Sequence, residues 1–176
     1  MKKALIFLVL LSGVAHAGEE SQSDFTISYM DIAITYDAEY INARGTYFPA
    51  LTYDHTAVMI GFSRRTNEYV SLDFRIGKAD SDTATVTGEY EGVYENDLGE
   101  VVAANARFRW PLAPWFEPYG LVGFTQWRGD RQLTGRTFGV GVGARFGAFS
   151  LRVERQNVVA GRSDTDTNLL ILGYAL

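Results

Sequence analysis

The chain has 176 residues, of which 14% are aromatic, and a formal net charge of −5 at pH 7. An acidic chain is a poor partner for nucleic acid, whose phosphates bind basic surfaces, so we expect no nucleic-acid partner. The sequence has no cysteine, which excludes disulfides and a lipid-modified cysteine. A zinc site is not expected either, because His55 is the single histidine after residue 17.

The first 17 residues have the pattern of a secretory signal peptide. Lys2 and Lys3 precede an apolar run over residues 4–11, and Ala15-His16-Ala17 fits a small-x-small cleavage site. The run is too short to span a bilayer as a helix. We therefore expect a signal peptide over residues 1–17, followed by one exported domain over residues 18–176.

Eight later segments alternate apolar and polar residues with the period of two that is typical of β-strands. Each is about ten residues long, which suffices for a tilted strand to cross a membrane. In the third segment, for example, Val70 and Leu72 alternate with Ser71 and Asp73. The predicted strands cover residues 25–36, 56–64, 69–78, 101–110, 117–127, 137–146, 148–159 and 167–176.

The last three segments have one apolar face and one face of glycine and charge. A soluble protein would bury the apolar face, but here a secretion signal opens the chain and the final residues are themselves strand-like. The pattern therefore favours apolar side chains toward lipid and charged ones in a lumen. We predict an all-β fold: an antiparallel, up-and-down transmembrane β-barrel of eight strands in the cell outer membrane.

Two further segments leave the strand number open. Residues 39–48 and 85–94 are also rich in residues that favour strands. If both cross the membrane, the barrel has ten strands. If they lie in outer loops or extend hairpins above the membrane, it has eight, which we favour. Residues 66–68 are typical of a short periplasmic turn, and residues 79–100 of a long outer loop.

Several segments resemble a known family. Gly61-Phe62-Ser63 before a short turn, Pro118-Tyr119-Gly120 and the Gly-x-Gly-x-Gly run 139–143 are similar to those of the small outer membrane β-barrel proteins of Gram-negative bacteria, which include the transmembrane domain of outer membrane protein A. The resemblance covers residues 56–176 and implies fold more than function. Such proteins usually end in a phenylalanine that the barrel-assembly machinery reads, whereas this chain ends in Leu176.

The charged residues at the inward-facing positions of the predicted strands indicate a charge network in the lumen. A small barrel has little room beyond its own side chains, and an unpaired charge there is unfavourable. We therefore expect arginine–carboxylate pairs that plug the barrel; a narrow channel, gated by switching those pairs, is the alternative. Five basic against two acidic side chains would give such a channel an anion preference. The network comprises Asp73, Arg75, Arg107, Arg109, Arg145, Arg152 and Glu154.

Aromatic side chains predict interfacial girdles, and nothing in the sequence predicts catalysis. The girdle candidates are Trp110, Trp115, Tyr119, Trp127 and Tyr174. His55 is expected on the surface at a junction between loop and strand, with Asp54 directed to the opposite face. There is no His-x-Ser motif, so we expect no enzyme activity, no metal and no cofactor.

Two charged segments suggest surface roles. Residues 80–100 contain seven acidic side chains and no Lys or Arg, which is typical of a solvated loop; a weak divalent-ion site is the alternative. Arg128, Asp130, Arg131 and Arg136 could contact lipopolysaccharide phosphates. Expected partners are outer membrane lipids, lipopolysaccharide, the barrel-assembly machinery and periplasmic chaperones, with a monomeric chain. The function classes are a structural or surface-interaction barrel, a narrow channel, and a soluble lipocalin-like carrier.

Overall fold

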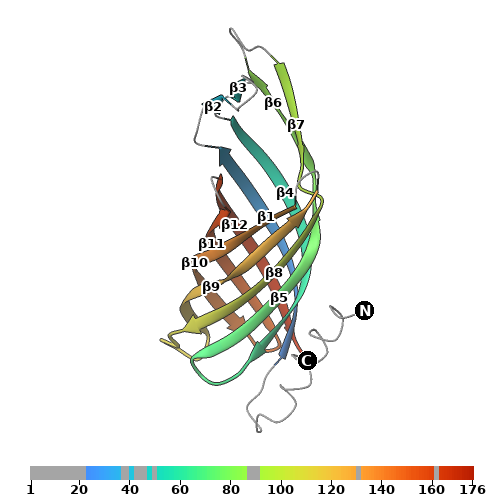
Figure 1. The fold of residues 1–176 in the computed structure, drawn as a ribbon. Helices are drawn as coiled ribbons and strands as arrows, with labels where there is room; N and C mark the ends of the chain where they lie inside the picture. Colours follow the sequence, from blue (N-terminus) through green and yellow to red (C-terminus); the bar gives the residue numbers. More distant parts are fainter. Residues whose placement is uncertain are drawn as a thin grey trace, which may run out of the picture.

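Eight long strands form one closed antiparallel barrel in the computed structural model, which describes residues 23–36, 40–41, 47–48, 51–86, 92–129, 132–160 and 163–176. Around the barrel the order is β1, β12, β11, β10, β9, β8, β5 and β4, with β4 closing onto β1 (Figure 1). The eight are β1 (Ser23–Tyr36), β4 (Leu51–Arg65), β5 (Val70–Ala79), β8 (Glu100–Arg109), β9 (Phe116–Arg128), β10 (Gln132–Phe146), β11 (Phe149–Ala160) and β12 (Ser163–Ala175). The prediction of an all-β, eight-stranded barrel is confirmed.

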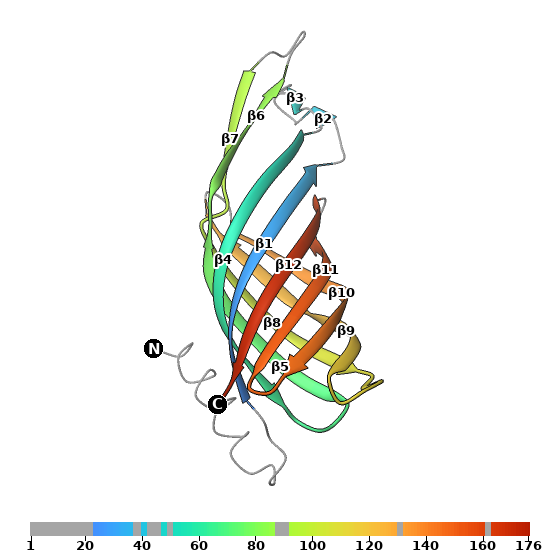
Figure 2. The ribbon, with the colours of Figure 1, turned by 180° about the vertical axis from the view of Figure 1, so that it is seen from behind.

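The two segments that left the strand number open form small hairpins outside the barrel. β2 (Tyr40–Ile41) pairs with β3 (Tyr47–Phe48), and β6 (Ser81–Val86) pairs with β7 (Gly92–Asp97). Figures 1 and 2 show both at one end of the barrel, with β6 and β7 rising beyond it. We call this the hairpin end. Residues 79–100, expected to be a loop, are therefore mostly a β-hairpin.

The opposite end, which we call the turn end, has only short connections between strands, whereas the hairpin end has the two long ones, residues 37–50 and 80–99, beside two short ones. Two residues, Gly147 and Ala148, join β10 to β11, and Gly147 has a φ of +60° that favours glycine. In the turn over residues 66–69, Asn67 Oδ1 accepts hydrogen bonds of 2.8 Å from the backbone N–H groups of Tyr69 and Val70. The C-terminal residue Leu176 also lies at this end (Figure 2).

The outer face of the barrel is an apolar belt. Successive side chains of a strand point to opposite faces, so every second residue is outside. Outward side chains such as Val58 and Phe124 are 60% and 61% exposed, whereas their inward neighbours Met59 and Thr125 are buried. A barrel that exposes its apolar side chains around its whole wall is built for lipid.

The interior has two layers. At the hairpin end it is an apolar core, in which Met30 and Ile32 of β1, Met59 of β4 and Trp127 of β9 are buried together. Toward the turn end most buried side chains are polar or charged, and buried threonines such as Thr125 and Thr137 lie beside the apolar core. The lumen is therefore charged over only part of its length, which the sequence pattern did not indicate.

Residues 1–17, predicted to be a signal peptide, lie outside the described residues, so that prediction stays open. Among the residues that are described, no helix is long and apolar enough to span a membrane.

Candidate functional site in the barrel lumen

Five charged side chains meet in the polar layer of the lumen. Asp73 and Arg75 come from β5, Arg107 from β8, and Arg152 and Glu154 from β11. All five side chains point into the lumen because each occupies an inward-facing position of its strand, and all five are buried. We call these residues the central cluster.

Arg75 and Glu154 form the best-ordered contact of the central cluster. Arg75 NH1 and NH2 donate to Glu154 Oε2 and Oε1 at 2.8 and 2.9 Å, a two-pronged pair between β5 and β11. Arg75 NH2 also donates to Asp73 Oδ2 at 3.2 Å. Such charge-assisted, bidentate bonds are strong and directional. Because β5 and β11 are not neighbours in the barrel, this pair crosses the lumen.

The other two arginines share one carboxylate oxygen. Arg107 NH2 and Arg152 NH1 each lie 3.6 Å from Asp73 Oδ1. Arg107 NH2 also donates to Ser63 Oγ at 3.0 Å, and its guanidinium lies 5.0 Å from the centre of the Tyr119 ring. The central cluster thus holds three guanidinium groups against two carboxylates.

Two uncharged side chains complete the contacts of Glu154, and neither was predicted to belong to the charge network. The Tyr119 hydroxyl donates to Glu154 Oε1 at 2.9 Å, and Gln156 Nε2 donates to Glu154 Oε2 at 2.7 Å. Gln156 lies two residues after Glu154 on β11 and therefore faces the lumen as well. This spacing in the sequence could have identified Gln156 as a partner. Glu154 therefore accepts four hydrogen bonds, which compensate for its loss of hydration.

The prediction that Tyr119 and Trp127 belong to an aromatic girdle is wrong. Their side chains are 2% and 1% exposed and lie inside the barrel. β9 carries large apolar residues on both faces, since Leu121 points inward and Val122 outward, so alternation alone did not separate the faces. Tyr119 pairs in register with Gly141, whose missing side chain leaves room for the ring.

The remaining girdle candidates lie at the turn end. Trp110, Trp115 and Tyr174 are all exposed. Tyr174 also packs edge-on against Phe149, with ring centres 5.3 Å apart. These positions suit aromatic side chains at a membrane interface, and that role stays a prediction.

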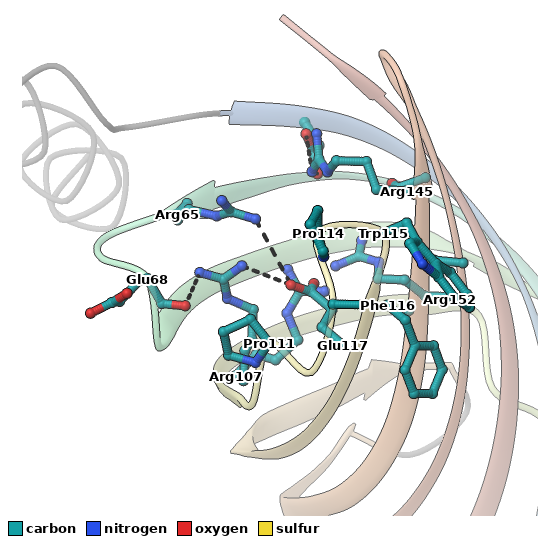
Figure 3. Close-up of a pocket in the computed structure, with 16 residues that line it drawn as sticks. Arg65, Glu68, Arg107, Pro111, Pro114, Trp115, Phe116, Glu117, Arg145 and Arg152 are labelled. Atoms are coloured by element: carbon teal, nitrogen blue, oxygen red, sulfur yellow. Dashed lines mark hydrogen bonds and ion pairs between the residues drawn. The ribbon is translucent and has the colours of Figure 1, made fainter.

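Arg109 and Arg145 belong to the predicted network but lie outside the central cluster, where both line a pocket near the turn end. Figure 3 shows Arg145 there. Arg109 NH1 donates to Glu117 Oε2 at 2.9 Å, and its NH2 donates to the backbone carbonyls of Asn67 and Glu68. Arg145 NH2 donates to Asp24 Oδ2 at 2.9 Å. The structure thus divides the seven predicted residues into one central cluster and two separate pairs.

The expectation that His55 is a surface residue is wrong. β4 begins at Leu51, so His55 lies within the strand and has inward parity, and it is 2% exposed. Its Nδ1 lies 3.1 Å from the backbone oxygen of Asp80, and its ring stacks on Tyr53. In the described part of the chain, no three His, Asp or Glu side chains are grouped to hold a metal ion.

Three acidic residues of the segment 80–100 form hydrogen bonds at the hairpin end: Asp80, Asp82 and Asp97. Asp80 accepts hydrogen bonds from the Thr56 N–H and hydroxyl groups at 2.7 and 2.8 Å. Asp82 accepts one from the Asp54 N–H, and Asp97 one from the Gly99 N–H. These contacts attach the β6–β7 hairpin to β4 and shape its return to β8. Glu89, Glu91, Asp130 and Arg131 lie outside the described residues.

Partial burial opposes ionisation of Asp80, which lies beyond the end of β5. The hydrogen bonds from Thr56 stabilise its carboxylate more strongly than burial disfavours it, so the pKa of Asp80 is below its usual value.

A closed barrel of eight strands with an apolar exterior and a charged inner layer defines the class of transmembrane β-barrels. The outer membrane protein beta-barrel domain family matches residues 5–175, and the chain belongs to this family. It is therefore an outer membrane β-barrel protein. In such proteins the short turns face the periplasm and the longer loops face outward, so we expect the turn end on the periplasmic side and the hairpin end on the extracellular side.

Similar solved structures share the fold at low sequence identity. The attachment invasion locus protein Ail of Yersinia pestis, solved with the heparin analogue sucrose octasulfate, is 13% identical with a TM-score of 0.55; the alignment covers 90% of this chain and 100% of Ail. The N-terminal β-barrel domain of OprF from Pseudomonas aeruginosa is 13% identical with a TM-score of 0.52, covering 89% of this chain and 100% of that domain. No curated protein matches the sequence significantly.

Proposed function

We propose that the protein is a structural and surface-interaction component of the outer membrane, with a lumen closed by its own side chains. The observation that carries this proposal is the Arg75–Glu154 pair, which joins β5 to β11 across the interior at 2.8 Å. The apolar layer around Trp127 lies next to it, toward the extracellular end. An ion would therefore meet a charged and then an apolar barrier, and the second offers no hydration.

Single-channel recording in planar bilayers tests this closure. We expect no discrete conductance steps from the wild-type protein. We also expect none from Glu154→Ala, because the apolar layer does not depend on that carboxylate. Discrete steps from the wild type would overturn the closed lumen and establish the narrow channel. An anion preference in those steps would agree with the excess of guanidinium groups in the central cluster.

The surface-interaction part of the proposal rests on the β6–β7 hairpin. The hairpin rises beyond the barrel at the extracellular end (Figure 1). Its segment, residues 80–100, is acidic and has no Lys or Arg. Ail was solved with a sulfated heparin analogue, but an acidic hairpin repels a polyanion. We therefore propose that this hairpin meets a cationic surface.

Binding of fluorescent polylysine and heparin to the protein in neutral vesicles tests the sign of this charge preference. We expect salt-sensitive polylysine binding that is lost when residues 81–97 are replaced by a short neutral turn. Heat-modifiability on gels serves as the control that the shortened barrel still folds. Equal polylysine binding by the shortened barrel, or a preference for heparin at this hairpin, would contradict the proposal.

Localisation and partners remain part of the same proposal. We propose export through a signal peptide cleaved after Ala17, assembly by the barrel-assembly machinery with periplasmic chaperones, and a monomer surrounded by lipid and lipopolysaccharide. Nothing in the described lumen suggests catalysis, since its charged groups are held in ion pairs, and we propose no enzyme activity. N-terminal sequencing of protein from the outer membrane fraction should begin at Gly18; another start would contradict the cleavage site.

A further inference from the structure

An arginine-rich pocket of about 220 Å³ lies at the periplasmic mouth of the lumen. Figure 3 shows its side chains, which come from strands on several sides of the barrel and from the turn before β9. Its lining includes five arginines and three carboxylates. The charged lining residues are Asp24, Arg65, Glu68, Arg107, Arg109, Glu117, Arg145 and Arg152.

Two of the three carboxylates of the pocket are already engaged. Asp24 accepts from Arg145, and Glu117 accepts from Arg109 at 2.9 Å and lies 3.8 Å from Arg65 NH2. The third, Glu68, is exposed in the turn, where its backbone carbonyl accepts from Arg109. None of these three carboxylates forms an ion pair with Arg107 or Arg152 within the described part of the chain.

Arg107 and Arg152 therefore bring unsatisfied donors to the inner wall of the pocket. Both side chains are more than nine-tenths buried. Among the described residues, no hydrogen-bond acceptor meets Arg152 Nε, NH1 or NH2, nor Arg107 Nε or NH1. The hydroxyl of Ser150, another lining residue, likewise has no hydrogen-bond partner among the described residues. Buried donors without acceptors are strongly unfavourable, and more so when charged.

We propose that this pocket binds a phosphate-type oxyanion. An oxyanion in the pocket balances the excess of guanidinium charge and, once the side chains of Arg152, Arg107 and Ser150 turn toward it, accepts from their unsatisfied N–H and O–H groups. Several guanidinium groups converge here, and the oxygens of a phosphate can accept from more than one of them, each in the bidentate geometry that guanidinium favours. A volume of 220 Å³ holds such a group with several waters, each of which occupies about 30 Å³.

The same chemistry has two sources at this end of the barrel: free phosphate in the periplasm, and the phosphate of a phospholipid headgroup in the inner leaflet. Both reach the pocket from the periplasmic side. The site is independent of the conductance proposal, because a closed lumen still has an open mouth.

Nuclear magnetic resonance of the wild-type barrel in octyl glucoside micelles gives the direct test. Titration with inorganic phosphate should shift the backbone amides of Gly143, Ser150 and Arg152, which line the pocket. A parallel titration with dihexanoyl phosphatidylglycerol should shift the same amides if a headgroup is the source. If neither titration moves these amides, or if shifts occur only at exposed arginines such as Arg155, the proposal is overturned.

Two pocket variants and one control separate binding from general charge effects. Arg152→Gln should weaken phosphate binding by at least about tenfold in calorimetry, because it removes charge-assisted hydrogen bonds. Gly143→Leu keeps every arginine but fills the pocket beside Arg152, since a Cβ at residue 143 would lie 3.3 Å from Arg152 Cγ. Gly143→Leu should therefore abolish phosphate binding. Arg155→Gln, on the outer surface, should bind as the wild type does.

The use of two pocket variants keeps the test decisive if one of them does not fold. If Arg152→Gln does not give a heat-modifiable barrel, Gly143→Leu and the wild-type titration still decide the question. Unchanged phosphate affinity in a folded Gly143→Leu barrel would overturn the assignment of the pocket.

Discussion

Glu154 is the residue on which the central cluster depends most. Its two carboxylate oxygens accept from Arg75, Tyr119 and Gln156, all of which are buried. In a confined lumen an arginine without its carboxylate is unfavourable, because no solvent replaces the lost partner. The stability of the inner layer therefore rests on a few pairs and not on the number of charges.

Replacement of Glu154 by Gln should lower the free energy of unfolding by about 3–5 kcal/mol, because it leaves the buried Arg75 without its main counter-charge. Urea-induced unfolding in lipid vesicles measures the loss. Asp166→Asn is the matched control, since it breaks an exposed pair with Arg155 and should cost at most about 1 kcal/mol. Equal losses of unfolding free energy in both variants would show that the buried pair contributes no more to stability than the exposed pair.

A glycine supports the same cluster indirectly. A Cβ at Gly141 would lie 2.6 Å from Tyr119 Cζ and 2.7 Å from the Val153 carbonyl oxygen, so Gly141→Ala must displace the ring that bonds Glu154. We expect a loss of about 1–3 kcal/mol, as for overpacked cores. Gly143→Ala is the control, because its nearest neighbours are flexible side chains at 3.3 Å. The prediction fails if the two alanine variants unfold at the same urea concentration.

At the scale of elements, the attachment of the β6–β7 hairpin to β4 depends on an ionised side chain. The Asp80 carboxylate accepts hydrogen bonds from the backbone N–H and the hydroxyl of Thr56, and the backbone N–H of Asp80 donates to the Thr56 carbonyl. These contacts hold the base of the hairpin against β4, just beyond the point where the pairing of β4 with β5 ends.

The attachment should weaken in acid. Because the pKa of Asp80 in the folded protein is below its usual value, its stabilising contribution is fully present above the unfolded pKa of about 3.9. The contribution is lost as the pH falls through the folded pKa. Hydrogen exchange at the Thr56 amide, corrected for its intrinsic rate, should accelerate below about pH 4. Asp80→Asn should remove this dependence; a pH response that persists in this variant would refute the assignment.

The strands themselves were well predicted from the sequence. All eight predicted segments overlap barrel strands, because outward and inward residues alternate clearly on most of them, although β4, β10 and β12 begin four or five residues earlier than predicted. β1, β9 and β12 are exceptions, with large apolar side chains on both faces, and β9 gave the two wrong girdle assignments. His55 was misplaced for a related reason, since β4 extends farther toward the hairpin end than its apolar outer face indicates.

At the scale of the whole molecule, the apolar exterior is what separates a membrane barrel from a soluble carrier. Outward side chains from all eight strands are exposed, including Phe25, Ile60, Val140 and Leu172. The soluble carrier considered from the sequence would leave this belt in water, which does not fit a monomeric soluble protein.

A charge in the belt should therefore be far more harmful than one beyond it. Val140→Arg lies within the outer face of β10 and should destabilise the barrel in vesicles by about 2–4 kcal/mol, since an arginine near the bilayer midplane is poorly solvated. Thr134→Arg, on the same strand and face but toward the extracellular end, should cost about 0–1 kcal/mol. If both changes are within about 0.5 kcal/mol of the wild type, the outer face meets water.

The sequence by itself determined the strands, the inward or outward parity of most residues, and the presence of charge in the lumen. These follow from local rules, because the period of two is set by the backbone of each strand. Only the tertiary structure decided which charges meet, that Tyr119 bonds Glu154, and that part of the interior is apolar. Those contacts join strands far apart in the sequence, such as β5 and β11, whose side chains meet only once the barrel has closed.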